Sequence, residues 1–320
     1  LPRGDGAKVM RVDFPLVDLL GQAEPFRLQA DGPPLDCPAR IAPAIGPWRK
    51  RRRPRVSIIV LNRNGAAWLA DLLASIVATG PGNGEQPRNG EGQRNGEGEA
   101  VEVIVVDHAS DDESRLVAAG FAGALALSVI ARDANHSFAA SNNLAAKQAR
   151  GDFLFFVNND ITFLEPCVRR LAAWLETDTA IGAVGMRLWE PRPAGDRWRP
   201  QVHHDGIHVA VAQADGEPPL YRPVEVSREA VPAVGARDVP AVTAAAMMVR
   251  RADFLALGGF DEGYVYGQED VDLCLRLRAE LGRIIVCDSG LSAMHRRAAT
   301  RDIARQHAPE PMMPVLAAQA

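Results

Sequence analysis

Short apolar runs alternate with helix-like segments through the first half of the chain. The first run, residues 56–61, is rich in the β-branched residues that favour strands, and residues 66–78 after it have the pattern of a helix. Because nearly continuous apolar strands must be covered on both faces, this alternation predicts an α/β fold with a doubly wound, mostly parallel central sheet and helices on both faces. Further strands are predicted over 101–107, 125–130 and 153–157, and further helices over 111–119, 137–150 and 165–177.

The pattern is looser in the second half of the chain. Residues 191–240 contain several prolines and the pair His203-His204, which we expect in a loop. Regular structure resumes after this segment. The predicted elements are a buried run over 242–250, an amphipathic helix over 270–281 that stops at Gly282, and a short strand over 284–287 with His295 shortly after it.

These patterns divide the chain into three parts. Residues 1–54 form a Pro-rich N-terminal extension that ends in a basic linker, residues 55–300 form the α/β domain, and residues 301–320 form a C-terminal tail. Within the domain, residues 80–100 consist mainly of Gly, Asn, Glu, Gln and Arg. Such a stretch has little apolar surface to bury, so we expect a disordered insertion there.

Composition and charge narrow the class of protein. The 320 residues are 47% hydrophobic and 24% charged, as expected of a globular protein, and the net charge of −4 gives the whole chain no bias toward nucleic acid. We interpret the basic run Arg49–Arg55 as a solvated linker; the alternative is a patch that contacts anionic lipid headgroups. Nucleic acid is the weaker interpretation, because no aromatic residues are interleaved with the run.

Apolar stretches and cysteines indicate the compartment. The longest apolar stretches, near 122–131 and 241–249, are about half as long as a membrane-spanning helix requires. The four cysteines are scattered without a C-x-x-C pair, which argues against a zinc ribbon or a disulfide framework and fits a reducing compartment. We therefore expect a cytoplasmic protein, with peripheral contact at the inner face of the membrane if the basic run binds lipid.

Polar residues gather just after three of the predicted strands, at 62–65, 107–112 and 158–160. In open α/β sheets ligands bind in the crevice at the carboxyl ends of the strands, so these clusters predict the position of a site. The sequence has no P-loop, no G-x-G-x-x-G fingerprint and no G-x-S-x-G elbow. Their absence argues against kinase-type, Rossmann-cofactor and serine-hydrolase chemistry.

Two carboxylates in these clusters have both a functional and a structural interpretation. Asp160 follows a buried strand and two asparagines, where it would bind a metal–diphosphate unit or form an Asx turn or helix cap. Asp107 would bind a base or ribose, or cap the helix that begins near Asp111. For Asp111 and Asp112 the structural interpretation, favourable charges in a first helical turn, is the better one.

A third acidic group opens the helix predicted over 270–281. Glu269, Asp270 and Asp272 crowd its first turn, behind the aromatic and glycine residues of 263–268. Acids at this position favour the helix dipole, which one or two of them would satisfy. Adjacent carboxylates also raise each other's pKa, which is one way to hold a general base near neutrality.

The order of these segments resembles family 2 glycosyltransferases, in particular the bacterial rhamnosyltransferase-like branch. The resemblance covers about three quarters of the chain, from about Val56 to about Arg297, and so many segments in order make the match specific. It rests on Ser57–Gly65, Val105–Asp111, Asn135–Asn143, Phe156–Asp160, Thr243–Ala245, Gly258–Glu262, Tyr266–Arg276 and His295.

The resemblance implies a GT-A fold, a nucleotide-sugar donor, a divalent metal (Mg²⁺ or Mn²⁺) and inversion at the anomeric carbon. The partners that it implies are a UDP-, dTDP- or GDP-sugar and a glycan or lipid-linked acceptor. Asp270, backed by Glu269, would take the proton of the acceptor hydroxyl. The other implied roles are donor binding by Asn62, Asn64, Asp107, Asn142 and Asn158, and metal binding by Asp160 with His295 as a further ligand.

Several residues depart from the family pattern. Arg63 stands where an aromatic residue is frequent, so a guanidinium would stack on the base or the stacking would be lost. Ala140, Ser141 and Ala244 replace frequent glycines, which narrows the approach of the backbone to a ligand. Asn158 leaves one carboxylate at its strand end, so metal binding would depend on the bound diphosphate; asparagine at this position also occurs in the resembling branch.

Two rival functions remain open at this point. The departures suggest a degenerate, non-catalytic domain that binds a nucleotide sugar or a glycan, although the retained Glu269-Asp270 pair favours an enzyme because binding alone needs no base. The other rival is a nucleotidyltransferase that makes the sugar nucleotide. Its usual Gly-rich, Arg-containing loop is absent after residues 56–61.

Overall fold

The computed structural model describes residues 39–45, 54–80, 101–191, 201–212, 220–225, 235–264 and 267–296. The first half of the chain forms four parallel strands joined through helices, as the apolar pattern predicts. Its elements are β2 (Val56–Asn62), α2 (Ala66–Thr79), β3 (Val101–His108), α3 (Ser114–Phe121), β4 (Ala126–Arg132), α4 (Phe138–Gln148) and β5 (Phe153–Asn158).

The second half adds strands of both directions. The long elements are α5 (Val168–Thr177), β7 (Ile181–Glu190), β12 (Ala246–Arg250), α6 (Arg251–Ala256), α7 (Glu269–Leu281) and β13 (Ile284–His295). Short strands are β1 (Ala39–Arg40), β6 (Ile161–Phe163), β8 (Gln201–His204) and β11 (Ala236–Asp238), and β9 (Ile207–Ala212) pairs with β10 (Leu220–Glu225) in a separate hairpin.

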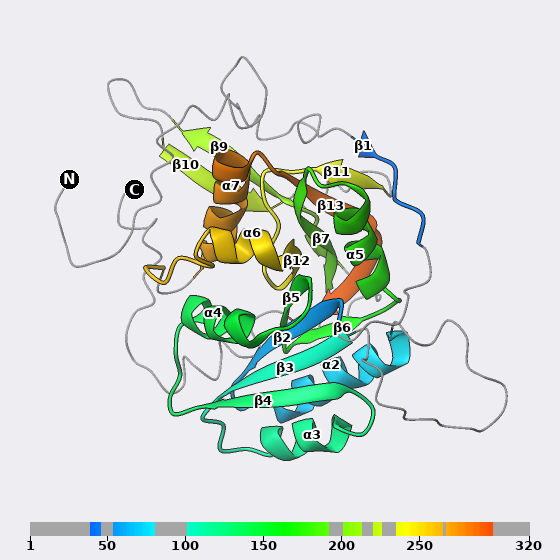
Figure 1. Ribbon diagram of the computed structural model, residues 1–320, viewed down its shortest axis with the longest axis vertical. Helices are drawn as coiled ribbons and strands as arrows, with labels where there is room; N and C mark the ends of the chain where they lie inside the picture. The colour runs from blue at the N-terminus through cyan, green and yellow to red at the C-terminus, as the bar shows by residue number, and fades with distance from the viewer. Residues whose placement is uncertain are drawn as a thin grey trace.

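The central sheet has eleven strands among the described residues, in the order β1-β11-β13-β7-β12-β5-β2-β3-β4, with β6 beside β13 and β8 beside β7. β12 lies antiparallel between β5 and β7, and β7 pairs in parallel with β13. The start of β12 therefore lies beside the end of β5. This junction brings the second half of the chain to the carboxyl edge of the first half (Figure 1).

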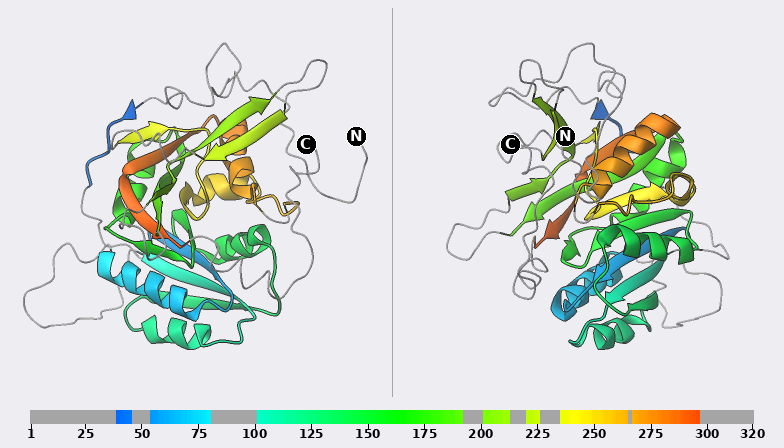
Figure 2. Two further views of the ribbon diagram at one scale, coloured as in Figure 1. Left: turned by 180° about the vertical axis from the view of Figure 1, so that it is seen from behind. Right: turned by 90° about the vertical axis from the view of Figure 1, so that its left-hand side faces the viewer.

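Helices cover the sheet on both faces, which confirms the predicted α/β architecture (Figure 2). One core packs α2, α3 and α5 on one face, and the other packs α4, α6 and α7 on the opposite face. β3 is buried along its whole length, as a strand covered on both sides must be. None of the helices in the described ranges is long and apolar enough to cross a membrane.

Three expectations about local structure are wrong. His203 and His204 lie in strand β8, because the register with β7 extends the sheet into the proline-containing region. The last strand does not stop at residue 287: β13 continues past a bulge to His295, where β6 pairs with its end. Helix α3 begins at Ser114 rather than at Asp111, so Asp111 and Asp112 lie before its first turn.

The predicted domain limits lie largely outside the described residues. This holds for residues 81–100 of the expected insertion, for the basic run Arg49–Arg53 and for the C-terminal tail. One part of the N-terminal extension is described, and it belongs to the sheet. Strand β1 pairs antiparallel with β11, and Arg40 forms ion pairs with Asp178 and Asp238.

Candidate active site

Three polar loops meet at the carboxyl edge of β2, β3 and β5. The loop after β2 is tied to the loop after β3, because Asn64 Oδ1 accepts from Asp111 N at 2.9 Å and Ser110 Oγ accepts from Asn64 N at 3.0 Å. Asn62 links the same loop to β5 through a 2.8 Å hydrogen bond from Asn159 Nδ2. The predicted donor residues Asn62 and Asn64 thus lie at this edge, where they join the loops that would surround a ligand.

Asp107 ends β3 with one carboxylate oxygen fixed and the other without a hydrogen bond. Oδ2 accepts from Arg115 Nε at 2.6 Å and from Ser110 N at 3.3 Å, whereas Oδ1 is buried and accepts none. Burial alone would raise the pKa of Asp107, but the hydrogen bonds from Ser110 and Arg115 outweigh it and lower that pKa. The site therefore holds an ionised carboxylate whose Oδ1 is suited to a ligand N–H or O–H donor.

The predicted structural role of Asp112 is confirmed in a different form. Its Oδ2 accepts from Ala66 N at 2.9 Å, at the start of α2, and its Oδ1 accepts from Ser114 N at 3.0 Å, at the start of α3. One side chain thus satisfies backbone donors at two helix N-termini, where anionic groups are favoured. This fixes α2 and α3 beneath the Asp107 loop.

Asn142 and Asn143 point in different directions from helix α4. The predicted donor residue Asn142 is buried and donates to Phe138 O at 3.0 Å within its own helix. Asn143 instead reaches the loop that precedes α7. Its Nδ2 donates to Phe260 O at 2.8 Å and to Glu262 Oε1 at 3.0 Å, and its Oδ1 accepts from Phe260 N at 2.9 Å.

Asp160 and His295 form a compact pair of metal-ligand types. The pairing of β6 with β13 places Ile161 opposite His295, and Arg296 N donates to Asp160 O at 3.1 Å. Asp160 Oδ1 lies 3.3 Å from His295 Nε2 but receives no hydrogen bond, although both side chains are at least nine-tenths buried. Carboxylate and imidazole are both side chains that bind divalent cations, so this close pair fits a shared cation.

The residues needed for a larger metal cluster are not gathered here. Among the described ranges, no set of three or more His, Cys, Asp or Glu side chains could hold an ion. His203 lies near the pair, with its ring centroid 5.1 Å from that of His295. Asp160 and His295 thus fit a metal whose remaining ligands come from a bound molecule.

Asp270 lies at the N-terminus of α7 and is held by two backbone donors. Its Oδ2 accepts from Ala244 N at 2.9 Å, and its Oδ1 accepts from Val271 N at 2.9 Å. The segment that contains Ala244 also contacts the end of β5, because Asn158 N donates to Ala245 O at 3.0 Å. Asp160 of the Asp160–His295 pair follows this strand end. Asn158, Asp160 and Asp270 therefore belong to one edge of the sheet.

The two other acids of this helix start are in different environments. Glu269 is buried, and its Oε2 accepts no hydrogen bond. Burial, reinforced by the adjacent charge of Asp270, raises the pKa of Glu269 to about 8. Asp272 instead pairs with Arg276 at 2.7 Å, one turn along α7. The three clustered acids thus differ in state: Glu269 is neutral, Asp270 is held by backbone N–H groups, and Asp272 is in an ion pair.

Comparison with known families identifies the chain. The family model for glycosyl transferase family 2 matches residues 57–254, which is more than half of its length. The chain belongs to glycosyl transferase family 2. The match includes the loops after β2, β3 and β5, and the predicted family and enzyme class are confirmed.

Two curated relatives match parts of this glycosyltransferase. "O-antigen biosynthesis protein RfbC" of Myxococcus xanthus is 34% identical over 173 residues, which are 52% of this chain and 12% of the relative. "Uncharacterized protein y4gI" of Sinorhizobium fredii is 28% identical over 236 residues, 72% of this chain and 23% of the relative. The glycosyltransferase therefore spans less than a quarter of the length of either relative.

Solved structures share the fold of this glycosyltransferase. Mannosyltransferase PcManGT from Pyrobaculum calidifontis, in complex with GDP-Man and Mn²⁺, has a TM-score of 0.53 at 19% identity, over 85% of this chain and 65% of that one. GalNAc-T7 with UDP, GalNAc and Mn²⁺ has a TM-score of 0.55 at 15% identity, over 75% and 42%. The likeness confirms the GT-A type of architecture.

Two side chains that organise this glycosyltransferase escape prediction from sequence. Asn143 and Arg276 both bind the loop before α7, and Arg276 donates to Leu257 O at 3.0 Å and to Gly259 O at 2.9 Å. Both residues lie inside segments that carry the family resemblance, but their partners are distant in the sequence. The signal that points to them is the Gly258-Gly259 pair, whose positive φ angles mark a tight turn that needs support.

Proposed function

We propose that this glycosyltransferase moves a sugar, with inversion at the anomeric carbon, from a nucleoside-diphosphate donor to a hydroxyl group of a glycan or lipid-linked acceptor. The observation that carries this proposal is the contact between Ala244 N and Asp270 Oδ2. Because Ala245 O also binds Asn158 N, this contact holds a carboxylate at the same sheet edge as Asp107 and Asp160. Inverting transfer needs such a group on the acceptor side, opposite the leaving diphosphate.

The donor would bind across the loops after β2, β3 and β5. The free Oδ1 of Asp107 would accept from a donor group of the nucleoside, with Asn62, Asn64 and Asn142 around it. Asp160 and His295 would hold a divalent cation, Mg²⁺ or Mn²⁺, together with oxygens of the diphosphate, and Asn158 would lie beside them. When bound, such a cation neutralises charge on the leaving group. The Mn²⁺ complexes of PcManGT and GalNAc-T7 support a cation of this kind.

The acceptor hydroxyl would lose its proton to Asp270. Two backbone N–H donors hold this side chain in place. Glu269, with a pKa of about 8, keeps its proton at neutral pH, so the two adjacent acids do not compete for the same charge. Asp272 is less suited to the role because Arg276 already pairs with it. We therefore assign the general base to Asp270 and a supporting role to Glu269.

The acceptor class is inferred from the name of one relative and from the basic run near the N-terminus. The name of the Myxococcus xanthus relative, which concerns O-antigen biosynthesis, supports a saccharide acceptor in polysaccharide assembly. A lipid-linked acceptor would bring the enzyme to the inner face of a membrane, where the run Arg49–Arg55 would contact anionic headgroups. We propose a cytoplasmic enzyme, with this peripheral contact if its acceptor is lipid-linked.

A donor panel tests the proposal. UDP-, dTDP- and GDP-sugars are incubated with the protein and Mg²⁺ or Mn²⁺, and nucleotide release is measured with and without oligosaccharide or lipid-diphosphate acceptors. We expect metal-dependent release from one nucleotide class, with a product of inverted anomeric configuration. Tight donor binding without release under any of these conditions would instead identify a non-catalytic binding domain.

A further inference from the structure

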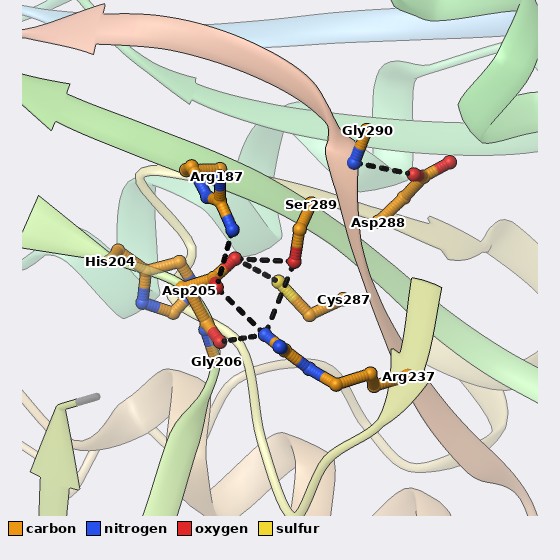
Figure 3. Close-up of polar contacts among 9 residues, drawn as sticks. All are labelled: Arg187, His204, Asp205, Gly206, Arg237, Cys287, Asp288, Ser289 and Gly290. Atoms are coloured by element: carbon orange, nitrogen blue, oxygen red, sulfur yellow. Dashed lines mark hydrogen bonds and ion pairs between the residues drawn. The ribbon is translucent and has the colours of Figure 1, made fainter. Parts of the chain in front are cut away.

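A buried charge cluster lies on the same face of the sheet as α7. Asp205, in the turn between β8 and β9, is fully buried and accepts from Arg187 at 3.0 Å, Arg237 at 2.7 Å and Ser289 Oγ at 2.6 Å. Figure 3 shows its carboxylate at the centre of side chains from β7, β11 and β13. Arg237 also donates to Asp205 O at 3.2 Å, so both the side chain and the backbone of the turn are anchored.

Burial alone would raise the pKa of Asp205, but the bonds from Arg187, Ser289 and Arg237 outweigh it and lower that pKa. The carboxylate therefore stays ionised and keeps two guanidinium groups in place. Such a cluster is costly to bury, and removing one partner leaves charge uncompensated. Well-packed apolar side chains often stabilise a core at least as well as a buried ion cluster, so stability alone does not explain this cluster.

The anchored turn contacts the segment that carries Ala244. After Asp205, Gly206 has a φ of +99° and packs against Val239, where a Cβ would lie 2.8 Å from the valine Cγ1. Ile207 then exchanges two backbone hydrogen bonds with Ala241, at 2.8 and 3.2 Å. The turn is thus fixed to residues 239–241 by a close approach and a pair of backbone bonds.

A second contact comes from the histidine before Asp205. His204 is buried, and its Nε2 accepts from Gly206 N at 3.3 Å and from Thr243 N at 3.5 Å. The next residue along the chain after Thr243 is Ala244, whose N–H binds Asp270. The imidazole therefore binds the N–H of Thr243, directly before the Ala244 N–H that holds Asp270.

Helix α7 contacts the other side of the same segment. Arg278 donates to Val239 O at 2.6 Å, and Asp270 accepts from Ala244 N. Residues 239–245 therefore form a strap held between the β8–β9 turn and α7. Displacing the turn would move the strap and, with it, the N–H that fixes the Asp270 carboxylate.

We propose that Asp205 is a positioning residue for Asp270, acting through the strap of residues 239–245. The inference rests on the proposed role of Asp270 as general base. Asp205 itself touches neither substrate nor reacting atoms in this account. Its effect is on chemistry rather than on binding, because a small displacement of a catalytic group lowers the rate of the chemical step strongly.

A double-mutant cycle between Asp205→Asn and Asp270→Asn tests the proposal in the full chain, with initial rates of transfer measured over a range of donor and acceptor concentrations. We expect Asp205→Asn to lower kcat by about 10- to 100-fold with KM for both substrates nearly unchanged. In the Asp270→Asn background the same substitution should change kcat by less than about twofold, because the group it positions is already gone.

Asp288→Asn is the matched control. Asp288 is equally buried on the neighbouring part of β13, but it binds Arg170 and Trp174 of α5 instead of the turn. We expect this variant to lose thermal stability while keeping kcat within about threefold of wild type. The proposal would be overturned if Asp288→Asn lost as much kcat as Asp205→Asn. It would also be overturned if Asp205→Asn lowered kcat by the same factor in the wild-type enzyme and in the Asp270→Asn variant.

Ser289→Ala covers the case in which Asp205→Asn does not fold. This substitution removes the 2.6 Å hydrogen bond to Asp205 without leaving a charge unpaired. We expect kcat to fall about threefold or more, and we expect no such loss when Asp270→Asn is also present. Unchanged kcat in Ser289→Ala would then overturn the proposal. If Asp270→Asn is fully active, the assignment of the general base fails, and the positioning role of Asp205 fails with it. If Asp270→Asn is inactive but Asp205→Asn and Ser289→Ala are fully active, only the positioning role fails.

Discussion

Asp160 Oδ1 and His295 Nε2 lie 3.3 Å apart although nearly half of the chain separates the two residues in sequence. The three-residue strand β6 produces this contact, because it leaves the end of β5 and pairs antiparallel with the last residues of β13. The carboxylate that follows β5 and the histidine that ends β13 thus reach one point. We propose that this arrangement lets a single carboxylate at this strand end serve a metal-assisted donor site.

Substitution of Asp160 tests the metal role. Asp160→Ala removes the only carboxylate of the pair, so we expect the metal-dependent part of the affinity for a nucleoside diphosphate to disappear. His295→Ala should weaken it about 10-fold or more, as the loss of one of several ligands does. Isothermal calorimetry with UDP or GDP, with and without Mn²⁺, measures both effects.

Asp71→Ala is the control for this experiment. Asp71 pairs with Arg296, the neighbour of His295, at 2.8 Å, and about half of its side chain is exposed. Its removal changes charge next to the site without touching the proposed ligands. If Asp160→Ala left the metal-dependent affinity for the nucleoside diphosphate unchanged, Asp160 would not belong to the metal site.

Glu269 should make the stability of the fold depend on pH. Its pKa is about 8 in the folded chain and about 4.3 in an unfolded chain, so the folded state binds this proton more tightly. The stabilising contribution of the proton is complete below about pH 4 and is lost as the pH rises to 8. Glu269→Gln removes this titration, and its Tm relative to wild type should rise by at least about 3 °C between pH 5 and pH 8.

Glu280→Gln controls for loss of an acidic charge from the same helix, since Glu280 is exposed near the end of α7. Differential scanning calorimetry of the three proteins over this pH range gives the comparison. A Tm difference between Glu269→Gln and wild type that stays flat or falls with pH would show that Glu269 is ionised throughout.

The turn at Gly258-Gly259 offers a matched pair of substitutions. Both glycines have positive φ, +79° and +85°, so alanine at either position costs about 1–2 kcal/mol of backbone strain. A Cβ at Gly258 meets open space, whereas one at Gly259 would overlap Oδ1 of Asn143. We expect Gly259→Ala to lower the free energy of unfolding by at least about 3 kcal/mol, because it also disrupts the Asn143 hydrogen bonds.

Urea denaturation measures both variants of this pair. Gly258→Ala should stay within about 2 kcal/mol of wild type and keep its activity. Equal destabilisation of the two variants would mean that the Asn143 contact contributes little to the fold.

Sequence patterns predict long elements in both halves of this fold, including α5, β12 and α7, but miss the short strands of the second half. β2, β3 and β5 are buried on both faces, so their apolar runs are long and their ends are marked by polar residues. β8 and β11 are only four and three residues long, too short to show a period, and their place in the sheet depends on partners far along the chain. The sequence therefore predicts a loop where His203 and His204 form part of β8.

The same physical reason divides the site residues. Asp107, Asp160 and Asp270 sit at element ends that local patterns reveal, and the family resemblance places them. The contacts made by Asn143, Asp205 and Arg276 join elements that only the tertiary fold brings together. The approach of His295 to Asp160 depends on a bulge in β13 and on the pairing of β6, which no local pattern encodes.

The turnover of Asp270→Asn, measured with the donor and acceptor identified by the panel, tests most directly whether Asp270 is the general base. General-base catalysis contributes about 10²–10⁴-fold, whereas loss of a charge at a helix end costs only about 0.3–1 kcal/mol of stability. We predict that kcat falls at least about 100-fold while donor affinity and Tm stay close to wild type. A kcat within about threefold of wild type would contradict the account and place the base elsewhere.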